Sequence, residues 1–219
     1  MNRLPATLVI FDCDGVLVDT EAISCRVLAA AATTEGVAMT PAEAMAAYRG
    51  HFLRYVTGDL ERRLGRKLPD SWAGDFETAR AEAFRTEVTA IPGAESAVQG
   101  VVEAGLAICV ASQASPEKMR LTLGLTGLSP HLPERVRFSA GSVARPKPAP
   151  DLFLHAAATM GHPPQRCTVI EDSVAGVTAA HAAGMRVLAY AADADPEALA
   201  AAGGEPVYDM RDVPGRVLG

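Results

Sequence analysis

The spacing of hydrophobic and polar positions changes twice along the chain. Thr7–Phe11 is a continuous apolar and β-branched run, which is typical of a strand buried on both faces. After Thr20, and as far as about residue 90, apolar positions recur every three or four residues, and this pattern predicts four helices and no strand. From Gly93 to Tyr190, short apolar runs alternate with helical stripes, which indicates a parallel sheet covered by helices.

Cap residues and glycines mark the ends of the predicted helices. Thr20 is expected to cap the first helix, and Thr40-Pro41 opens the second, because a capping hydroxyl followed by proline suits a helix start. Beyond the helical segment, strands are expected at 106–111, 136–138, 168–170 and 187–190. Helices are expected around the stripe Ala97, Val98, Val101 and Val102, and over 115–124, 150–160, 174–183 and the alanine-rich stretch 191–202.

The order of these elements predicts an α/β fold with an inserted helical unit. Residues 1–19 and 91–219 are expected to form one domain around the parallel sheet, with Thr7–Phe11 as its first strand. Residues 20–90 are expected to form an all-helical domain of four helices, inserted directly after the first strand and its turn.

Two acidic residues follow the first predicted strand. Asp12 and Asp14 are separated by one residue, so an extended backbone would place both carboxylates on the same side. Two like charges so close together favour a bound cation, and Mg²⁺ prefers oxygen ligands of this kind. Gly15 then allows a sharp turn close to whatever is bound. A bare Asp-x-Asp is also common as a surface acidic pair before a turn.

Further polar residues follow the other predicted strands. Ser112 could offer its hydroxyl to a phosphate, although a serine after a strand is often only a turn residue. Lys147 lies between two prolines, which restrict its loop and set it apart from the usual solvated loop lysine. Glu171 and Asp172 could add carboxylates opposite Asp12, and Asp172 or Ser173 could instead cap the next helix. Ligands of open parallel sheets bind beyond the carboxyl ends of the strands, where these residues are expected.

The string DxDGxLxDT that begins at Asp12 resembles the first motif of the haloacid dehalogenase-like (HAD) phosphohydrolases. Ser112, Lys147 and the pair Glu171-Asp172 resemble the second, third and fourth motifs, in the same order. The resemblance implies a Rossmann-like core with a helical cap. It also implies Asp12 as a nucleophile that becomes aspartyl-phosphate and Asp14 as the general acid/base.

The resemblance also implies a set of binding residues around the nucleophile. Phosphate would be bound by Ser112, Gln113 and Lys147. The expected cofactor is Mg²⁺, with Asp12, Asp14, Asp172 and Glu171 as its ligands; Glu171 could act directly or through another ligand.

The string Ile170-Glu-Asp-Ser-Val-Ala-Gly176 is similar to the subfamily of β-phosphoglucomutases and sugar-phosphate phosphatases. The stretches around Asp12–Arg26, Asp172–Gly184 and Ala191-Ala-Asp193 look most similar to bacterial 6-phosphogluconate phosphatases. Ser24 stands where the mutases carry a cap histidine, and Ala114 replaces a second serine seen in them. These differences favour a phosphatase acting on a sugar phosphate or a phosphosugar acid such as 6-phosphogluconate. The alternatives are a phosphosugar mutase and a catalytically silent binding protein of the same fold. Arg49, His51 and Arg54 are candidate cap contacts to the substrate.

Composition narrows the class of partner. The 219 residues include 26 acidic and 20 basic side chains, a net charge of −6, which provides no basic surface for nucleic acid or an anionic membrane. The four cysteines lack metal-binding spacing and are expected to be buried thiols. No signal peptide or membrane-length apolar run is evident, so we expect a cytoplasmic protein, a monomer, whose partner is a small phosphorylated substrate.

Overall fold

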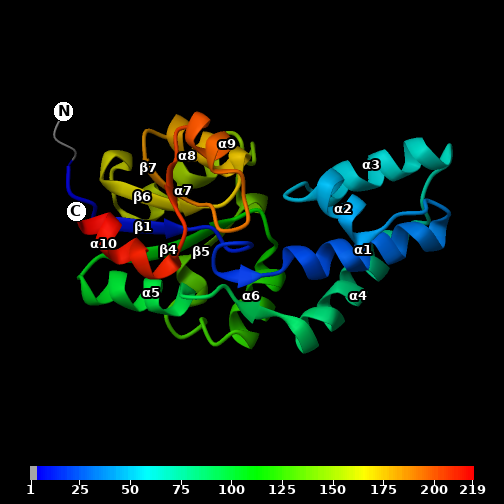
Figure 1. The fold of residues 1–219 in the computed structure, drawn as a ribbon, viewed down its shortest axis with the longest axis horizontal. Helices are drawn as coiled ribbons and strands as arrows, with labels where there is room; N and C mark the ends of the chain where they lie inside the picture. The colour runs from blue at the N-terminus through cyan, green and yellow to red at the C-terminus, as the bar shows by residue number, and fades with distance from the viewer. Residues whose placement is uncertain (1–3) are drawn as a thin grey trace. The chain divides into compact units, whose positions relative to one another are not determined.

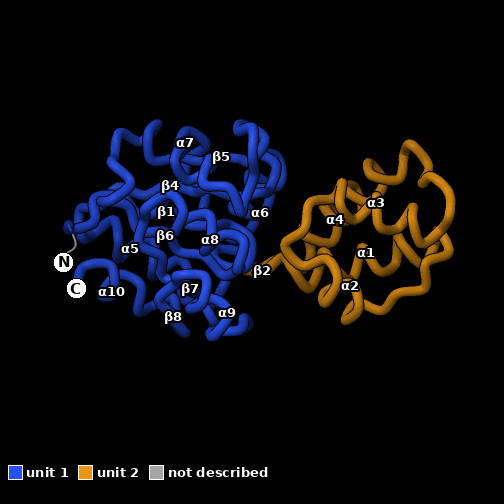
Figure 2. The backbone as a smooth tube through the Cα atoms, turned by 90° about the horizontal axis from the view of Figure 1, so that it is seen from above, with its two compact units in different colours: residues 1–18, 90–219 blue, residues 19–89 orange. Residues whose placement is uncertain are grey.

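The computed structural model describes residues 4–219 and divides the chain into two compact units (Figure 2). The first unit contains the chain up to Val18 together with Ala90–Gly219, and the second contains Asp19–Thr89. The two connections between the units, β2 (Val18–Asp19) and β3 (Thr89–Ala90), pair as a two-stranded sheet. These two short strands were not expected, since a strand of two residues leaves no alternation to detect in the sequence.

A six-stranded parallel sheet forms the centre of the first unit. Its strand order is β5-β4-β1-β6-β7-β8, so the chain starts in the middle and builds outward on both sides. The strand β1 pairs with β4 on one side and β6 on the other, with Phe11 opposite both Val110 and Ile170. The strands are β1 (Leu8–Phe11), β4 (Ala107–Ser112), β5 (Arg137–Ser139), β6 (Cys167–Glu171), β7 (Arg186–Tyr190) and β8 (Glu205–Val207).

Helices cover both faces of this sheet (Figure 1). Helix α5 (Ala94–Glu103) packs with α10 (Val213–Leu218) on one face, and α7 (Asp151–Met160) packs with α8 (Val174–Ala182) on the other. The remaining helices of the first unit are α6 (Pro116–Leu125), α9 (Pro196–Ala201) and the 3₁₀ turns Glu134–Val136, Ala140–Ser142, Pro164–Arg166 and Met210–Asp212. The α/β architecture with a Rossmann-like parallel sheet is confirmed.

The central strand is apolar because both of its faces are covered. All four residues of β1 are fully buried, which explains why the run shows no alternation. The apolar stripe predicted on α5 included one residue too many, Val102. Ala97, Val98 and Val101 are buried, whereas Val102 is 46% exposed and lies on the outer side of the helix.

The C-terminal part of the chain differs most from the prediction. Only Pro196–Ala201 of the expected helix 191–202 is helical, because Asp195 is the N-cap and its carboxylate accepts hydrogen bonds from the N–H groups of Glu197 and Ala198. The strand β8 and the helix α10 were not predicted. The strand has three residues and contains Pro206, which is tolerated because β8 is an edge strand.

The second unit consists of four helices: α1 (Glu21–Glu35), α2 (Pro41–Tyr48), α3 (Leu53–Leu64) and α4 (Trp72–Glu87). Helix α2 begins with a capping box, in which the Thr40 hydroxyl accepts from the Glu43 N–H and the Glu43 carboxylate accepts from the Thr40 N–H. Thr20 is at the N-cap position of α1 as predicted, but its side chain makes no capping hydrogen bond. A separate apolar core, including Leu28, Leu60 and Trp72, holds the four helices together.

All four cysteines are buried free thiols, as expected. None of the helices between residues 4 and 219 has the length and apolar character needed to cross a membrane.

Candidate active site

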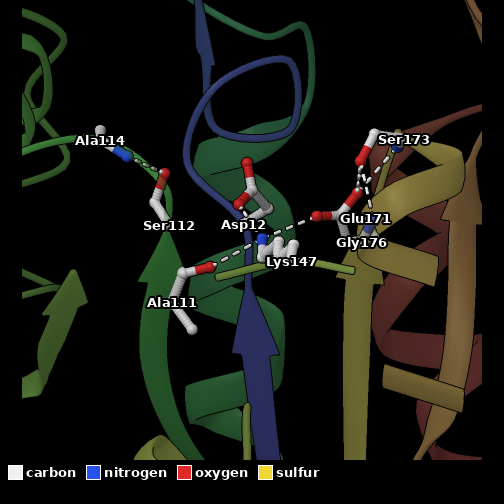
Figure 3. Close-up of polar contacts among 8 residues, drawn as sticks. All are labelled: Asp12, Ala111, Ser112, Ala114, Lys147, Glu171, Ser173 and Gly176. Atoms are coloured by element: carbon white, nitrogen blue, oxygen red, sulfur yellow. Dashed lines mark hydrogen bonds and ion pairs between the residues drawn. The ribbon is translucent and has the colours of Figure 1, made fainter. Parts of the chain in front are cut away.

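The site forms where three neighbouring strands end. Asp12 directly follows β1, Ser112 is the last residue of β4 and Glu171 is the last residue of β6. Because β1 lies between β4 and β6 and the strands are parallel, all three side chains reach the same edge of the sheet (Figure 3). The later strands are added on both sides of β1, with β4 and β5 on one side and β6, β7 and β8 on the other, and open α/β sheets bind ligands at the point where the strand order reverses.

Asp12 is held by the neighbouring strand. Its N–H donates to the carbonyl oxygen of Ile170 at 2.9 Å, which continues the pairing of β1 with β6 by one residue. The residue is only 6% exposed, so its carboxylate lies at the bottom of the site rather than on the surface.

The turn after Asp12 is tight and closely packed. The N–H of Gly15 donates to the carbonyl oxygen of Val18 at 2.9 Å, and Gly15 has a φ of +79°. A Cβ atom on Gly15 would lie 2.2 Å from Oδ2 of Asp172, so the Asp172 carboxylate rests against the backbone of this turn. The sequence prediction that Asp172 lies across from the first motif is consistent with this contact.

Lys147 lies at the centre of the site. Its ammonium donates to Oδ1 of Asp12 at 2.5 Å, to Oε1 of Glu171 at 2.7 Å and to the carbonyl oxygen of Ala111 at 3.1 Å (Figure 3). A lysine ammonium has three donors, and all three are used here. The nitrogen also lies 4.7 Å from the ring centroid of the buried Phe153. Lys147 is therefore a fixed charge in the structure and not a mobile surface lysine.

Glu171 holds Lys147 in this position. One carboxylate oxygen accepts from Lys147, and the other accepts from the N–H of Ser173 at 2.8 Å and from its hydroxyl at 2.9 Å. Both oxygens of this fully buried side chain are thus engaged. Ser173 in turn caps α8 by accepting from the N–H of Gly176, so the capping alternative considered for this segment applies to Ser173.

Burial and neighbouring charges shift the pKa values of Asp12 and Lys147. The pKa of Asp12 is raised to about 7, because burial and the nearby Glu171 raise it by more than the adjacent Lys147 lowers it. Burial disfavours the charged form of Lys147, but Asp12 and Glu171 more than offset this effect, so the pKa of Lys147 is raised. The lysine therefore remains a cation, and the charge state of Asp12 is the sensitive one.

Ser112 lies beside Asp12, at the end of the neighbouring strand β4. Its Oγ accepts from the N–H of Ala114 at 3.2 Å, which leaves the hydroxyl proton as a donor. Ser139, at the end of β5, donates to the carbonyl oxygen of Ala114 at 2.7 Å and fixes the same loop. The sequence analysis missed Ser139 because β5 is short. Gln113 follows Ser112 in this loop and is half-buried.

Asp14 contacts a second lysine that the sequence analysis did not single out. The ammonium of Lys118 lies 2.9 Å from Oδ1 of Asp14, and both side chains are largely buried, with 13% and 15% exposed. A signal was available, because the Ser115-Pro116 cap places Lys118 in the first turn of α6, and this helix starts at the edge of the sheet where Asp14 lies.

The three candidate cap residues belong to the second unit. Arg49 is the C-cap residue of α2, and His51 stacks on Tyr55 with ring centroids 4.3 Å apart. The guanidinium of Arg54 lies 4.7 Å from the ring centroid of Phe52. Their role as substrate contacts stays a prediction.

The donor chemistry of the site suits a hard cation. Asp12, Asp14 and Asp172 offer only oxygen ligands, and the close fit of Asp172 against Gly15 brings its carboxylate to the same turn. Between residues 4 and 219, no group of three or more His, Cys, Asp and Glu side chains is already arranged to hold a metal ion. The oxygens of Asp12 and Asp14 named above are paired with Lys147 and Lys118 instead.

Comparison with known proteins identifies the same family over most of the chain. A family model described as haloacid dehalogenase-like hydrolase matches residues 6–184. The chain is 31% identical to 6-phosphogluconate phosphatase of Escherichia coli over 88% of this chain and 85% of that protein. It is 34% identical to hexitol phosphatase A of the same organism, over 85% and 83% of the two chains.

A solved structure from Deinococcus radiodurans, a HAD family hydrolase with bound phosphate and sodium, has a similar fold. Its TM-score is 0.78 at 29% identity, with 97% of this chain and 96% of that chain covered.

Proposed function

Because the chain belongs to the haloacid dehalogenase-like hydrolases and is a phosphatase, we propose that it hydrolyses the phosphate monoester of a small sugar or sugar acid through an aspartyl-phosphate on Asp12. The observation that carries this proposal is the buried contact of Lys147 with Asp12 and Glu171 at the carboxyl ends of β1, β4 and β6. A cation fixed beside a buried carboxylate is suited to bind a phosphoryl group next to a nucleophile.

In the first step, an Asp12 carboxylate oxygen forms a bond to phosphorus while the bond from phosphorus to the ester oxygen breaks. Lys147 stabilises the negative charge on the phosphoryl oxygens, and the Ser112 hydroxyl donates to one of them. Asp14 gives its proton to the departing alkoxide, so the leaving group is released as a neutral alcohol. The products of this step are the alcohol and aspartyl-phosphate.

In the second step, Asp14 takes a proton from water as the water oxygen bonds to phosphorus. The bond between phosphorus and the Asp12 oxygen breaks, which releases inorganic phosphate and restores the carboxylate. Asp14 thus returns to the protonated form that the next turnover needs. One acid/base residue is sufficient for both steps because the leaving alcohol and the incoming water use the same side of phosphorus in succession.

We propose Mg²⁺ as the cofactor, held by Asp12, Asp14 and Asp172. When bound, the ion supplies positive charge that balances the carboxylates and the phosphate oxygens. Glu171 is proposed to support the site through Lys147, since both of its oxygens already accept hydrogen bonds from Lys147 and Ser173.

The substrate class is proposed from the names of two relatives. The relatives named above are phosphatases of 6-phosphogluconate and of hexitols by their names, and both match more than four fifths of this chain. The helical unit Asp19–Thr89 is the proposed specificity cap, with Arg49, His51 and Arg54 as candidates for contacting the non-reacting part of the substrate.

A phosphate-release screen tests the proposal. The wild-type protein and Asp12→Asn are incubated with sugar phosphates, 6-phosphogluconate, phosphoglycolate and nucleotides, each with Mg²⁺ and with EDTA. The expected result is metal-dependent release from sugar or sugar-acid phosphates by the wild type alone. Interconversion of glucose 1-phosphate and glucose 6-phosphate without release would instead identify a mutase, and equal activity of Asp12→Asn would contradict the assigned nucleophile.

A further inference from the structure

We propose that Lys118 is a positioning residue that aims the carboxyl group of Asp14 at the leaving group of the substrate. This inference rests on the proposed function, because it concerns how Asp14 delivers its proton in the first step. The observation behind it is the contact of 2.9 Å between the Lys118 ammonium and Oδ1 of Asp14, in surroundings where only 13% and 15% of the two side chains are exposed.

The backbone around Asp14 is fixed, but its side chain needs an additional contact. The turn is closed by hydrogen bonds from the N–H groups of Leu17 and Val18 to the carbonyl oxygen of Cys13, at 2.9 and 3.0 Å. An aspartate side chain still has two rotatable bonds when its backbone is fixed. A charged partner at 2.9 Å removes this freedom, so Lys118 selects one direction for the Asp14 carboxyl group.

Lys118 itself comes from a rigid element. It is in the first turn of α6, where its N–H donates to the hydroxyl of the N-cap residue Ser115 at 3.2 Å and Pro116 restricts the preceding turn. One turn further along the same helix face, the hydroxyl of the buried Thr122 donates to the carbonyl oxygen of Lys118 at 3.0 Å. The backbone of Lys118 is therefore held from both sides, by Ser115 and by Thr122.

The two lysines of the site have separate tasks in this arrangement. Lys147 contacts Asp12 and Glu171 and has its three donors occupied, whereas Lys118 contacts Asp14. The two acidic residues of the first motif are thus each paired with a different cation.

The choice of leaving group distinguishes a positioning role from a general loss of structure. Cleavage of 6-phosphogluconate releases the alkoxide of gluconate, which needs a proton to depart. Cleavage of p-nitrophenyl phosphate releases p-nitrophenolate, which is stable as an anion and departs without one. The value of kcat/KM reports the steps up to release of the leaving group. Loss of Asp14 alignment should therefore lower kcat/KM for 6-phosphogluconate and leave that for p-nitrophenyl phosphate nearly unchanged.

The test compares Lys118→Met with Arg120→Met on these two substrates, after thermal unfolding has shown both variants to be folded. Arg120 is the matched control, because it is on the same helix and its ion pair with Glu134 is exposed. We expect Lys118→Met to lose about 10²-fold in kcat/KM for 6-phosphogluconate, the cost of a misplaced catalytic group, with little change for p-nitrophenyl phosphate. Arg120→Met should match the wild type on both substrates.

The same measurements can overturn the inference. An equal loss on both substrates would show that Lys118 binds the phosphoryl group or supports the fold, and no loss on either would show that Asp14 needs no partner. Adding Lys118→Met to Asp14→Asn should cause no further loss, and an additive loss would mean that Lys118 acts independently of Asp14. A wild-type protein that releases phosphate from neither substrate and from none of the sugar phosphates in the screen would overturn the proposed function itself, and this inference with it.

Discussion

Gly176 and the carboxylate of Glu171 pack so closely that position 176 has no room for a side chain. A Cβ atom on Gly176 would lie 1.8 Å from Oε1 of Glu171, the oxygen that accepts from Lys147. The glycine therefore provides the space in which the carboxylate holds Lys147, and the first turn of α8 is part of the active-site architecture.

Gly176→Ala tests this relationship. The added methyl group should displace Glu171 and with it Lys147, and a displacement of about 1 Å is expected to lower kcat/KM by about 10²-fold. Steady-state kinetics with p-nitrophenyl phosphate would measure the loss. Gly58→Ala is the control, because Gly58 is also in a helix but has no atom within 4 Å of the new methyl group. It should keep full activity and gain about 0.5–1 kcal/mol in free energy of unfolding.

The proposed mechanism requires an ionised Asp12 carboxylate to attack phosphorus, so the activity should fall on the acid side. The pKa of Asp12 is raised to about 7 in the metal-free protein, mainly by burial, so this carboxylate is protonated as the pH falls through that value. A bound divalent cation favours the charged carboxylate and opposes this shift. Profiles of kcat/KM against pH at low and high Mg²⁺ should therefore show the acid limb moving to lower pH as Mg²⁺ increases. An acid limb that is independent of Mg²⁺ would argue against Asp12 as a ligand.

Lys147→Met should abolish turnover and make the stability of the protein depend more strongly on pH. Without the cation, the buried carboxylates of Asp12 and Glu171 are uncompensated, and the pKa of Asp12, which Lys147 lowers in the wild type, should rise further above that of the unfolded chain. The folded state then binds more protons than the unfolded state, so the free energy of unfolding decreases as the pH rises. Urea unfolding at about pH 5 and about pH 8 should show the larger loss at the higher pH. Adding Glu171→Gln should recover part of that loss.

The second unit can be destabilised without a change in the chemistry. Thr40→Ala removes the capping hydroxyl of α2 and should cost about 1 kcal/mol in free energy of unfolding. Thr40 belongs to the unit Asp19–Thr89, whereas Asp12, Lys147 and Glu171 belong to the other. Circular dichroism during thermal unfolding would measure the stability loss, and kcat/KM for p-nitrophenyl phosphate should be unchanged.

The sequence allowed prediction of those elements whose pattern is local. Thr7–Phe11 was found because both faces of β1 are buried, and α2 because Thr40 and Pro41 form a recognisable helix start. The strand β8 was missed because it is a three-residue edge strand, and the outward position of Val102 depends on what covers α5. These features are decided by packing between distant parts of the chain.

In the candidate site, too, local patterns were predictable from the sequence and contacts between distant residues were not. The candidates Asp12, Asp14, Ser112, Lys147 and Asp172 were predicted from their places after strands and in motifs, and their roles stay predictions. Contacts across the fold could not be found in this way: Glu171 was expected to assist a metal directly or through another ligand, and its hydrogen bonds with Lys147 and Ser173 are evident only in the structure. The contact of Lys118 with Asp14 joins residues more than a hundred positions apart and has no local signature apart from the helix cap at Ser115.

The most direct test of the account is to trap the covalent intermediate. The enzyme is mixed with substrate and Mg²⁺, quenched in acid within a single turnover and treated with borohydride, which reduces an acyl phosphate to an alcohol. Mass spectrometry of the peptides should then show the side chain at position 12 converted to that of homoserine, and Asp12→Asn should show no such product. Rapid phosphate release by the wild type with Asp12 never modified would contradict the proposed aspartyl-phosphate mechanism.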